Sequence, residues 1–186
     1  MEQLPAAAAL SLIVATVAAH AQSIEQKAQL CAACDGAAGV PTQKNIPVIS
    51  GQQLGYLFIE LRDFKSGVRK NDMMSPIAQG LDQSDLLPLA TYFSQKTWPD
   101  LQQPQAAADA AAQALRVNAS VVCSSCHQEG FKGAGTQPRL AGQSRDYLGK
   151  TMTDFRTDAR ATTMTTFMKS ISQSDIAALA SYLAGL

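Results

Sequence analysis

The hydrophobic positions of this chain follow a helical spacing in several separate segments. Apolar side chains recur three or four positions apart in residues 54–64, 86–93 and 176–183. This spacing places them on one face of an α-helix. We expect the first helix to end at Gly67, and the other two to begin at the N-cap residues Ser84 and Ser174. No segment alternates convincingly as a β-strand, so the sequence predicts an all-α protein.

A set of short motifs occurs twice along the chain. Cys31-Ala-Ala-Cys34 recurs 92 residues later as Cys123-Ser-Ser-Cys126. Five further segments of the first half have a similar segment 91 or 90 residues later. They are Gly51-Gln52, Tyr56-Leu57, Asp63-Phe64, Met74 and Gln83-Ser84-Asp85. A steady offset over separated anchors indicates an internal duplication into two homologous domains. Domains of about 80 residues have marginal cores unless a cofactor or a crosslink supports them.

The domain joint is predicted near residues 97–106, where Pro99 and Pro104 interrupt helices. An alanine-rich helix from about residue 106 then opens the second half. We therefore expect one domain at residues 22–100 and another at residues 101–186.

The first 21 residues have the pattern of a secretory signal peptide. The apolar stretch 5–19 is short for a membrane span of about 20 residues and ends in Ala19-His20-Ala21. Signal peptides usually carry a Lys or Arg before the apolar stretch, whereas this segment has Glu2 and no basic residue there. Cleavage after Ala21 predicts export and leaves His127 as the only histidine of the mature chain.

Charge and composition exclude several classes of function. The chain has 15 Lys and Arg against 15 Asp and Glu. Because nucleic acids and anionic membranes attract a basic excess, no nucleic-acid partner is expected. Two histidines are too few for most multi-histidine metal enzymes.

The segment Cys123-Ser-Ser-Cys126-His127 matches the C-x-x-C-H signature of covalent haem c attachment. In this chemistry the two thiols bond to the haem and the histidine ligates the iron. A disulfide beside an incidental histidine and half of a zinc site are the alternatives. Zinc requires two more ligands, and this half of the chain has no other Cys or His. A thioredoxin-like site requires a βαβ context, which the pattern lacks.

A sixth iron ligand is predicted at Met164. Its thioether favours ferrous iron, so His/Met ligation suits electron transfer. Met164 matches Met74 in the repeat and keeps the same spacing to the following helix. Met152 and Met168 match Leu61 and Ala78, so we expect both in the core.

With these motifs the mature chain resembles the cytochrome c4 family of two-domain dihaem c-type cytochromes. The resemblance rests on the doubled C-x-x-C, the doubled Gly-Gln followed by Tyr, the Asp-Phe pairs, and Met74 and Met164. It implies two tandem cytochrome c-like domains and a periplasmic location. It also implies that the Pro138 carbonyl holds the His127 ring. The partners it implies are redox proteins: a membrane or periplasmic electron donor, and a terminal oxidase or dehydrogenase.

The first domain departs from that family at one residue. Where the pattern requires histidine, the chain has Asp35 after Cys31-Ala-Ala-Cys34. Three interpretations are open. Cys31 and Cys34 form a disulfide in a domain without haem; a haem is held by the thioethers and Met74 alone; or Asp35 is an engineered or erroneous residue in an ordinary dihaem protein. The intact surroundings favour a perturbed haem over an empty domain, because an empty haem cavity is a costly apolar void.

Three functions follow from these interpretations. The first is an electron carrier with a regular haem in the second domain, not an enzyme. The second is a haem enzyme or sensor that uses an open coordination position at the first haem. The third is a cytochrome subunit of a periplasmic dehydrogenase or oxidase complex.

Overall fold

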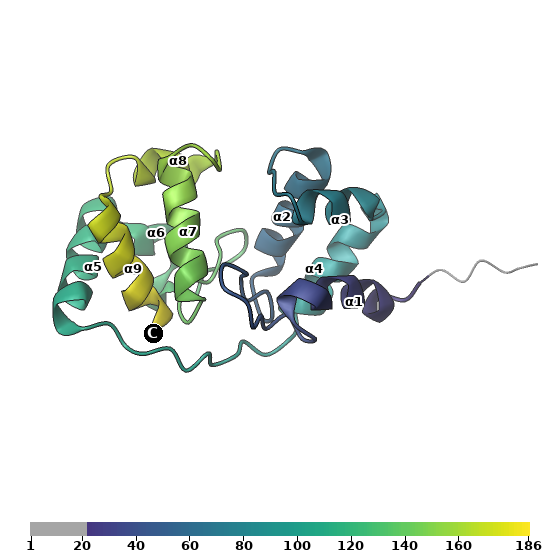
Figure 1. Ribbon diagram of the computed structural model, residues 1–186, viewed down its shortest axis with the longest axis horizontal. Helices are drawn as coiled ribbons and strands as arrows, with labels where there is room; N and C mark the ends of the chain where they lie inside the picture. Colours follow the sequence, from purple (N-terminus) through teal and green to yellow (C-terminus); the bar gives the residue numbers. More distant parts are fainter. Residues whose placement is uncertain (1–21) are drawn as a thin grey trace, which may run out of the picture.

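The computed structural model describes residues 22–186, which fold into two helical domains (Figure 1). The first domain contains α1 (Ile24–Asp35), α2 (Leu54–Ser66), α3 (Met74–Gly80), η1 (Gln83–Asp85) and α4 (Leu86–Ser94). The second contains α5 (Ala108–Val121), α6 (Cys123–His127), η2 (Glu129–Phe131), α7 (Arg145–Arg156), α8 (Thr163–Met168) and α9 (Gln173–Ala184). Within the described residues the only β structure is an isolated bridge between Ala134 and Gln137. The all-α prediction is confirmed.

The predicted signal peptide lies outside the described residues. Among the helices of residues 22–186, none combines the length and the apolar character that crossing a membrane requires.

The repeated hydrophobic stripes form the two cores. In α4, Leu86 and Leu89 are 0% and 1% exposed, and this helix packs on α2. In α9, the repeat counterparts Ile176 and Leu179 are also buried, and the helix packs on both α5 and α7. Met152 and Met168 belong to the second core cluster, as their repeat positions predict.

The helix ends follow the predictions only in part. α2 ends at Gly67, whose left-handed backbone (φ 78°) closes the helix as predicted. The N-cap predictions at Ser84 and Ser174 are wrong. Ser172 caps α9 by accepting a hydrogen bond from the Asp175 N–H, so the helix starts earlier. Ser84 lies inside a 3-10 turn, in which the Asp85 carboxylate accepts from the Asp82 N–H at 3.0 Å.

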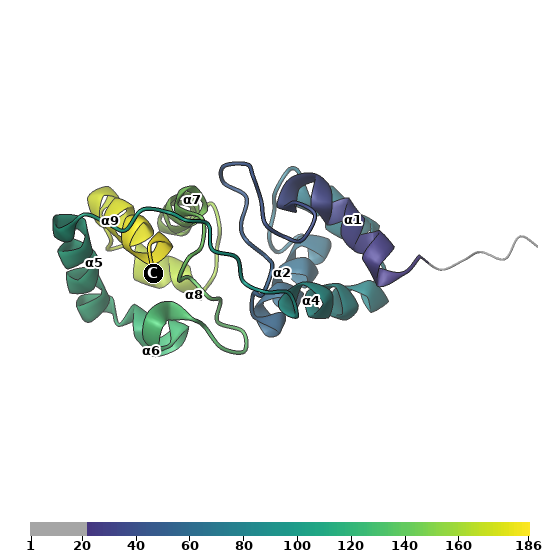
Figure 2. The same cartoon turned by 90° about the horizontal axis from the view of Figure 1, so that it is seen from below.

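The connection between α4 and α5 runs along the outside of both domains (Figures 1 and 2). Trp98 anchors it at the domain boundary, where the Arg139 guanidinium stacks 4.5 Å from the indole ring centre. Gly51 and Gly142 both approach Trp98, and both have positive φ. An added Cβ at Gly51 would lie 2.7 Å from the Trp98 backbone nitrogen. Trp98 therefore packs between the two domains, against Gly51 of the first and Arg139 and Gly142 of the second.

Candidate haem site

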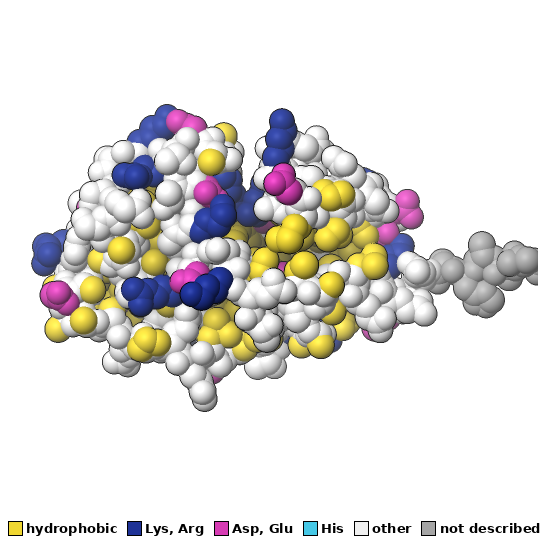
Figure 3. All heavy atoms as spheres, in the orientation of Figure 1, with side chains coloured by type: hydrophobic (Ala, Val, Ile, Leu, Met, Phe, Trp, Pro, Cys, Tyr) yellow, Lys and Arg dark blue, Asp and Glu magenta, His cyan; other side chains and the backbone are white. Residues whose placement is uncertain are grey.

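One cavity of about 940 Å³ lies between the domains and extends into both. Figure 3 shows the hollow between them, with hydrophobic side chains gathered on its first-domain wall. The residues that the sequence predicts as site residues all line this cavity: Cys31, Cys34, Met74, Cys123, Cys126, His127 and Met164. Asp35 lines it too.

In the second domain the attachment motif forms its own short helix. α5 ends where Val122 adopts a left-handed backbone (φ 54°), and α6 starts at Cys123. Asn118 stabilises this break, because its side-chain oxygen accepts from the Ser124 N–H at 3.1 Å and its backbone carbonyl accepts from the Val122 N–H. The break aims α6 so that Cys123 and His127 both reach the cavity wall.

His127 is prepared as a nitrogen ligand by its surroundings. The imidazole is 6% exposed, and its Nδ1 lies 3.0 Å from the Pro138 carbonyl oxygen. A carbonyl only accepts hydrogen bonds, so Nδ1 carries the proton and Nε2 keeps its lone pair. Burial lowers the pKa of His127, against the opposing effect of the Pro138 hydrogen bond, and so favours the neutral ring. The Pro138 contact expected from the family resemblance is confirmed.

Met164 lies at the start of α8, where the Thr162 hydroxyl accepts from its N–H at 3.1 Å. This capping contact holds the residue at the cavity wall, partly buried against the second core. The rivals Met152 and Met168 are 8% and 4% exposed within that core. All three methionines line the cavity, so the structure places Met164 there together with both rivals.

In the first domain the corresponding residues form the last turn of α1. Cys31 and Cys34 are free thiols, so the disulfide alternative is not what the structure contains. Burial raises the pKa of Cys31 to about 11. Asp35 is 7% exposed, and burial raises the pKa of its carboxyl to about 6. Within residues 22–186 no hydrogen bond or ion pair to this carboxylate is formed.

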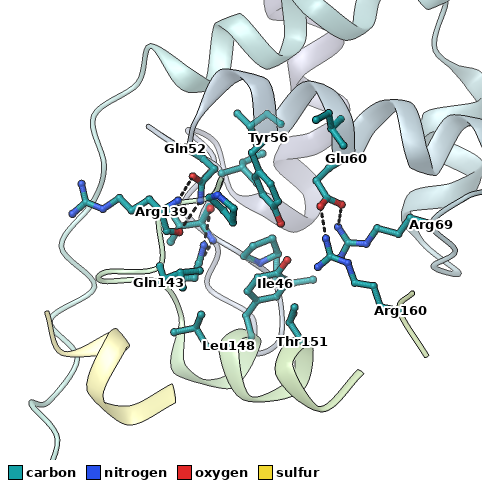
Figure 4. Close-up of a pocket in the computed structure, with 18 of the residues that line it drawn as sticks. Ile46, Gln52, Tyr56, Glu60, Arg69, Arg139, Gln143, Leu148, Thr151 and Arg160 are labelled. Carbon is teal, nitrogen blue, oxygen red and sulfur yellow. Dashed lines mark hydrogen bonds and ion pairs between the residues drawn. The ribbon is translucent and has the colours of Figure 1, made fainter. Parts of the chain in front are cut away.

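Two glutamines of the repeat join the domains beside the cavity (Figure 4). The Gln52 side chain accepts from the Arg139 N–H at 2.7 Å and donates to the Arg139 carbonyl at 3.0 Å. Gln143 makes the same pair of bonds to Val48, at 2.8 and 2.9 Å. The repeated Gly-Gln motif therefore belongs to the domain interface.

A second interdomain contact comes from residues that sequence reasoning missed. The Glu60 carboxylate binds Arg69 of its own domain and Arg160 of the other (Figure 4). Arg69 follows Arg62 and Lys65 in the sequence, a run of basic residues that is usually solvated, but its side chain is only 20% exposed here. Arg69 and Arg160 stand 91 residues apart, the repeat offset, and that signal could have found them. Tyr56 lies beside this group, and burial raises its pKa well above the usual value.

The residues of the second domain fit a covalently bound haem on three observations. The thiols of Cys123 and Cys126 are free, a neutral imidazole lies beside them, and the wall of the cavity is mostly apolar. No group of three or more His, Cys, Asp or Glu side chains in the described chain is arranged to hold a metal ion by itself. A cofactor that brings its own iron matches this donor set.

Comparison with known proteins agrees with this site. The family model described as cytochrome c matches residues 110–186. Cytochrome c4 of Pseudomonas aeruginosa is 33% identical, over 93% of this chain and 92% of the relative. The thiosulfate dehydrogenase electron acceptor of Stutzerimonas stutzeri is 31% identical, over 96% of this chain and 92% of the relative. The crystal structure of reduced recombinant cytochrome c4 from Pseudomonas stutzeri superposes with a TM-score of 0.79 at 30% identity, covering 88% of this chain and 96% of that one.

Fold and site together define a two-domain c-type cytochrome, an electron carrier with covalently bound haem c. More narrowly, the chain belongs to the cytochrome c4 family.

Proposed function

We propose that Cys123 and Cys126 attach a haem in the second domain and that His127 and Met164 ligate its iron. The haem supplies a one-electron ferric–ferrous couple. The hydrogen bond from His127 Nδ1 to the Pro138 carbonyl is the observation that carries this assignment, because it fixes the tautomer and the ring orientation. Met164 lies partly buried against the second core, where its thioether would be available as a ligand for the iron.

We further propose that Cys31 and Cys34 attach a second haem in the first domain, with Met74 as an iron ligand. Free thiols at helical spacing and the retained cavity support this proposal. A pyridine haemochrome assay per mole of chain tests both assignments. Two haems support both sites, one haem removes the first site, and zero haems contradicts the family function.

The domain bounds 22–100 and 101–186, the signal peptide at residues 1–21 and a periplasmic location belong to the same proposal. N-terminal sequencing of the purified holoprotein tests the cleavage, which is expected after Ala21.

One of the relatives supports a dehydrogenase as the electron donor of this chain. The relative from Stutzerimonas stutzeri is named as the electron acceptor of thiosulfate dehydrogenase and aligns with 96% of this chain. We propose that this chain accepts electrons from a periplasmic dehydrogenase of that class and passes them to a terminal oxidase. Stopped-flow mixing of the oxidised chain with such a dehydrogenase and thiosulfate should reduce its haem. Reduction that is equally fast without the dehydrogenase contradicts this partner.

A further inference from the structure

The first site differs from the second at the residue that should ligate iron. Asp35 and His127 each end the helix that carries the two cysteines. The next residues have nearly the same backbone, with φ 76° and ψ 161° at Gly36 and φ 66° and ψ 169° at Gln128. The two helix ends therefore match in backbone, and the side chain is what changes.

A shorter side chain leaves space at the cavity wall. Aspartate lacks most of the imidazole ring, so from the same backbone position its carboxylate ends farther from the cavity centre. The first-domain residues that line the same cavity include the apolar side chains of Ile46, Ile49 and Phe93. The space left corresponds to about one five-membered ring.

Asp35 also brings a polar group that nothing satisfies. Its side chain is 7% exposed, faces the cavity, and within residues 22–186 has no hydrogen-bond or ion-pair partner. Its oxygens are not among the fully enclosed unpaired atoms, so they remain reachable from the cavity, and a hydrogen-bond donor that enters there would be stabilised by the carboxylate. The residues fit a covalently attached haem, but they do not fit a histidine-ligated iron.

We propose that the first haem has an open coordination position beside Asp35, and that this position binds a small neutral molecule with a lone pair at one end and an N–H or O–H at the other. The lone pair would coordinate the iron, and the N–H or O–H would donate a hydrogen bond to the Asp35 carboxylate. Neutral nitrogen heterocycles of imidazole size have this chemistry and fill the space. Anions are disfavoured, because they would share a buried site with a carboxylate. This inference rests on the proposed attachment of haem to Cys31 and Cys34.

The test uses the oxidised holoprotein and imidazole as the probe. Electron paramagnetic resonance and visible spectra should show one low-spin and one high-spin haem per chain. Imidazole should convert the high-spin signal to low-spin with one molecule per chain. Azide, the anionic probe, should bind more weakly than imidazole.

Two variants isolate the role of Asp35. Asp35→His should give two low-spin haems that no longer respond to imidazole. Asp35→Ala should keep the open position but bind imidazole roughly tenfold more weakly, because a hydrogen bond to a charged acceptor is lost, and should bind azide more tightly. Unchanged affinities in Asp35→Ala would leave Asp35 without a role and overturn the proposal.

The remaining outcomes are equally decisive. Two low-spin haems in the unmodified chain overturn the open position while leaving the haem assignments of both domains standing. One haem per chain, low-spin and reversibly reducible, overturns both the open position and the first attachment but leaves electron transfer by the second domain. The haem count and the spin states together therefore separate failure of this inference from failure of the proposed function.

Discussion

Gln52 and Gln143 make the same contact from opposite sides of the domain interface. Each glutamine holds both the N–H and the carbonyl of one backbone residue in the other domain, Arg139 for Gln52 and Val48 for Gln143. Because Val48 and Arg139 are themselves 91 residues apart, the two contacts are related by the repeat. The duplication thus supplies a two-fold-like interface within one chain.

Removal of either glutamine side chain should loosen that interface by a similar amount. Gln143→Ala leaves the buried N–H and C=O of Val48 without a partner, and Gln52→Ala leaves the partly buried pair of Arg139 without one, which costs about 1–3 kcal/mol of unfolding free energy in each case. Urea unfolding, followed by far-ultraviolet circular dichroism, measures the change. Gln95→Ala is the control, since Gln95 is exposed. Equal stability of all three variants would contradict this prediction.

Glu60 should be the most sensitive charge at the interface. Glu60→Gln leaves the buried guanidiniums of Arg69 and Arg160 uncompensated, so we expect a loss of about 2–4 kcal/mol. Trypsin should then cut the connection between α4 and α5 faster, because the domains separate more often. Asp63→Asn is the matched control: its partner Arg62 is 50% exposed, and such surface pairs contribute about 0.5 kcal/mol. Equal proteolysis of the two variants would argue against an interdomain role for Glu60.

The methionine assignment can be tested by the reduction potential. Met164→His replaces a soft thioether by imidazole, so the potential of the second haem should fall, within the roughly 0.8 V range that axial ligands span. Redox titration followed at the haem absorption bands measures it. Met152→Leu changes a buried core methionine and should leave the potential nearly unchanged. A fall in the Met152 variant alone would move the ligand assignment to that residue.

The Lys27–Asp85 pair should make stability depend on pH in acid. The hydrogen bond from Lys27 Nζ at 2.6 Å is the main cause that lowers the pKa of Asp85 below its usual value. A lowered folded-state pKa stabilises the fold fully above the unfolded pKa of about 3.9 and loses this contribution as pH falls through the folded-state value. Asp85→Asn should therefore destabilise the protein by about 1–2 kcal/mol at neutral pH, with the difference shrinking below about pH 4.

Lys27→Gln is the control for that pair. It should reduce stability at neutral pH and weaken the acid dependence of the unmodified chain, because the same hydrogen bond is removed. Thermal unfolding across the acid range measures both variants. A destabilisation by Asp85→Asn that is constant with pH would assign the effect to the Asp82 N–H contact instead.

Much of the fold could be predicted from the sequence because its signals are local. The stripes of α2, α4 and α9 appear in the spacing of Leu and Ile, and the left-handed end of α2 appears in Gly67. The helix starts at Ser84 and Ser174 were predicted wrongly because several polar residues near each start can cap. Which of them does so depends on backbone geometry at the turn.

The site could be predicted only where its residues are neighbours in the sequence or are linked by the repeat. Cys123, Cys126 and His127 stand together in the sequence, and the repeat points to Met164 and Met74. Glu60 could not be recognised, because its partner across the interface, Arg160, is 100 residues away. A carboxylate beside lysines and arginines in sequence is indistinguishable from a solvated face until its surroundings are known.

The sequence by itself determined the duplication, the helical class, the attachment motif and the replacement of histidine by Asp35, because each is a matter of residue type and spacing. Only the tertiary structure decided that the two halves share one cavity, that Gln52 and Gln143 bind each other's domains, and that Asp35 is buried without a partner. These properties depend on which distant backbone and side-chain atoms come into contact and exclude water, and residue spacing within either half does not specify that.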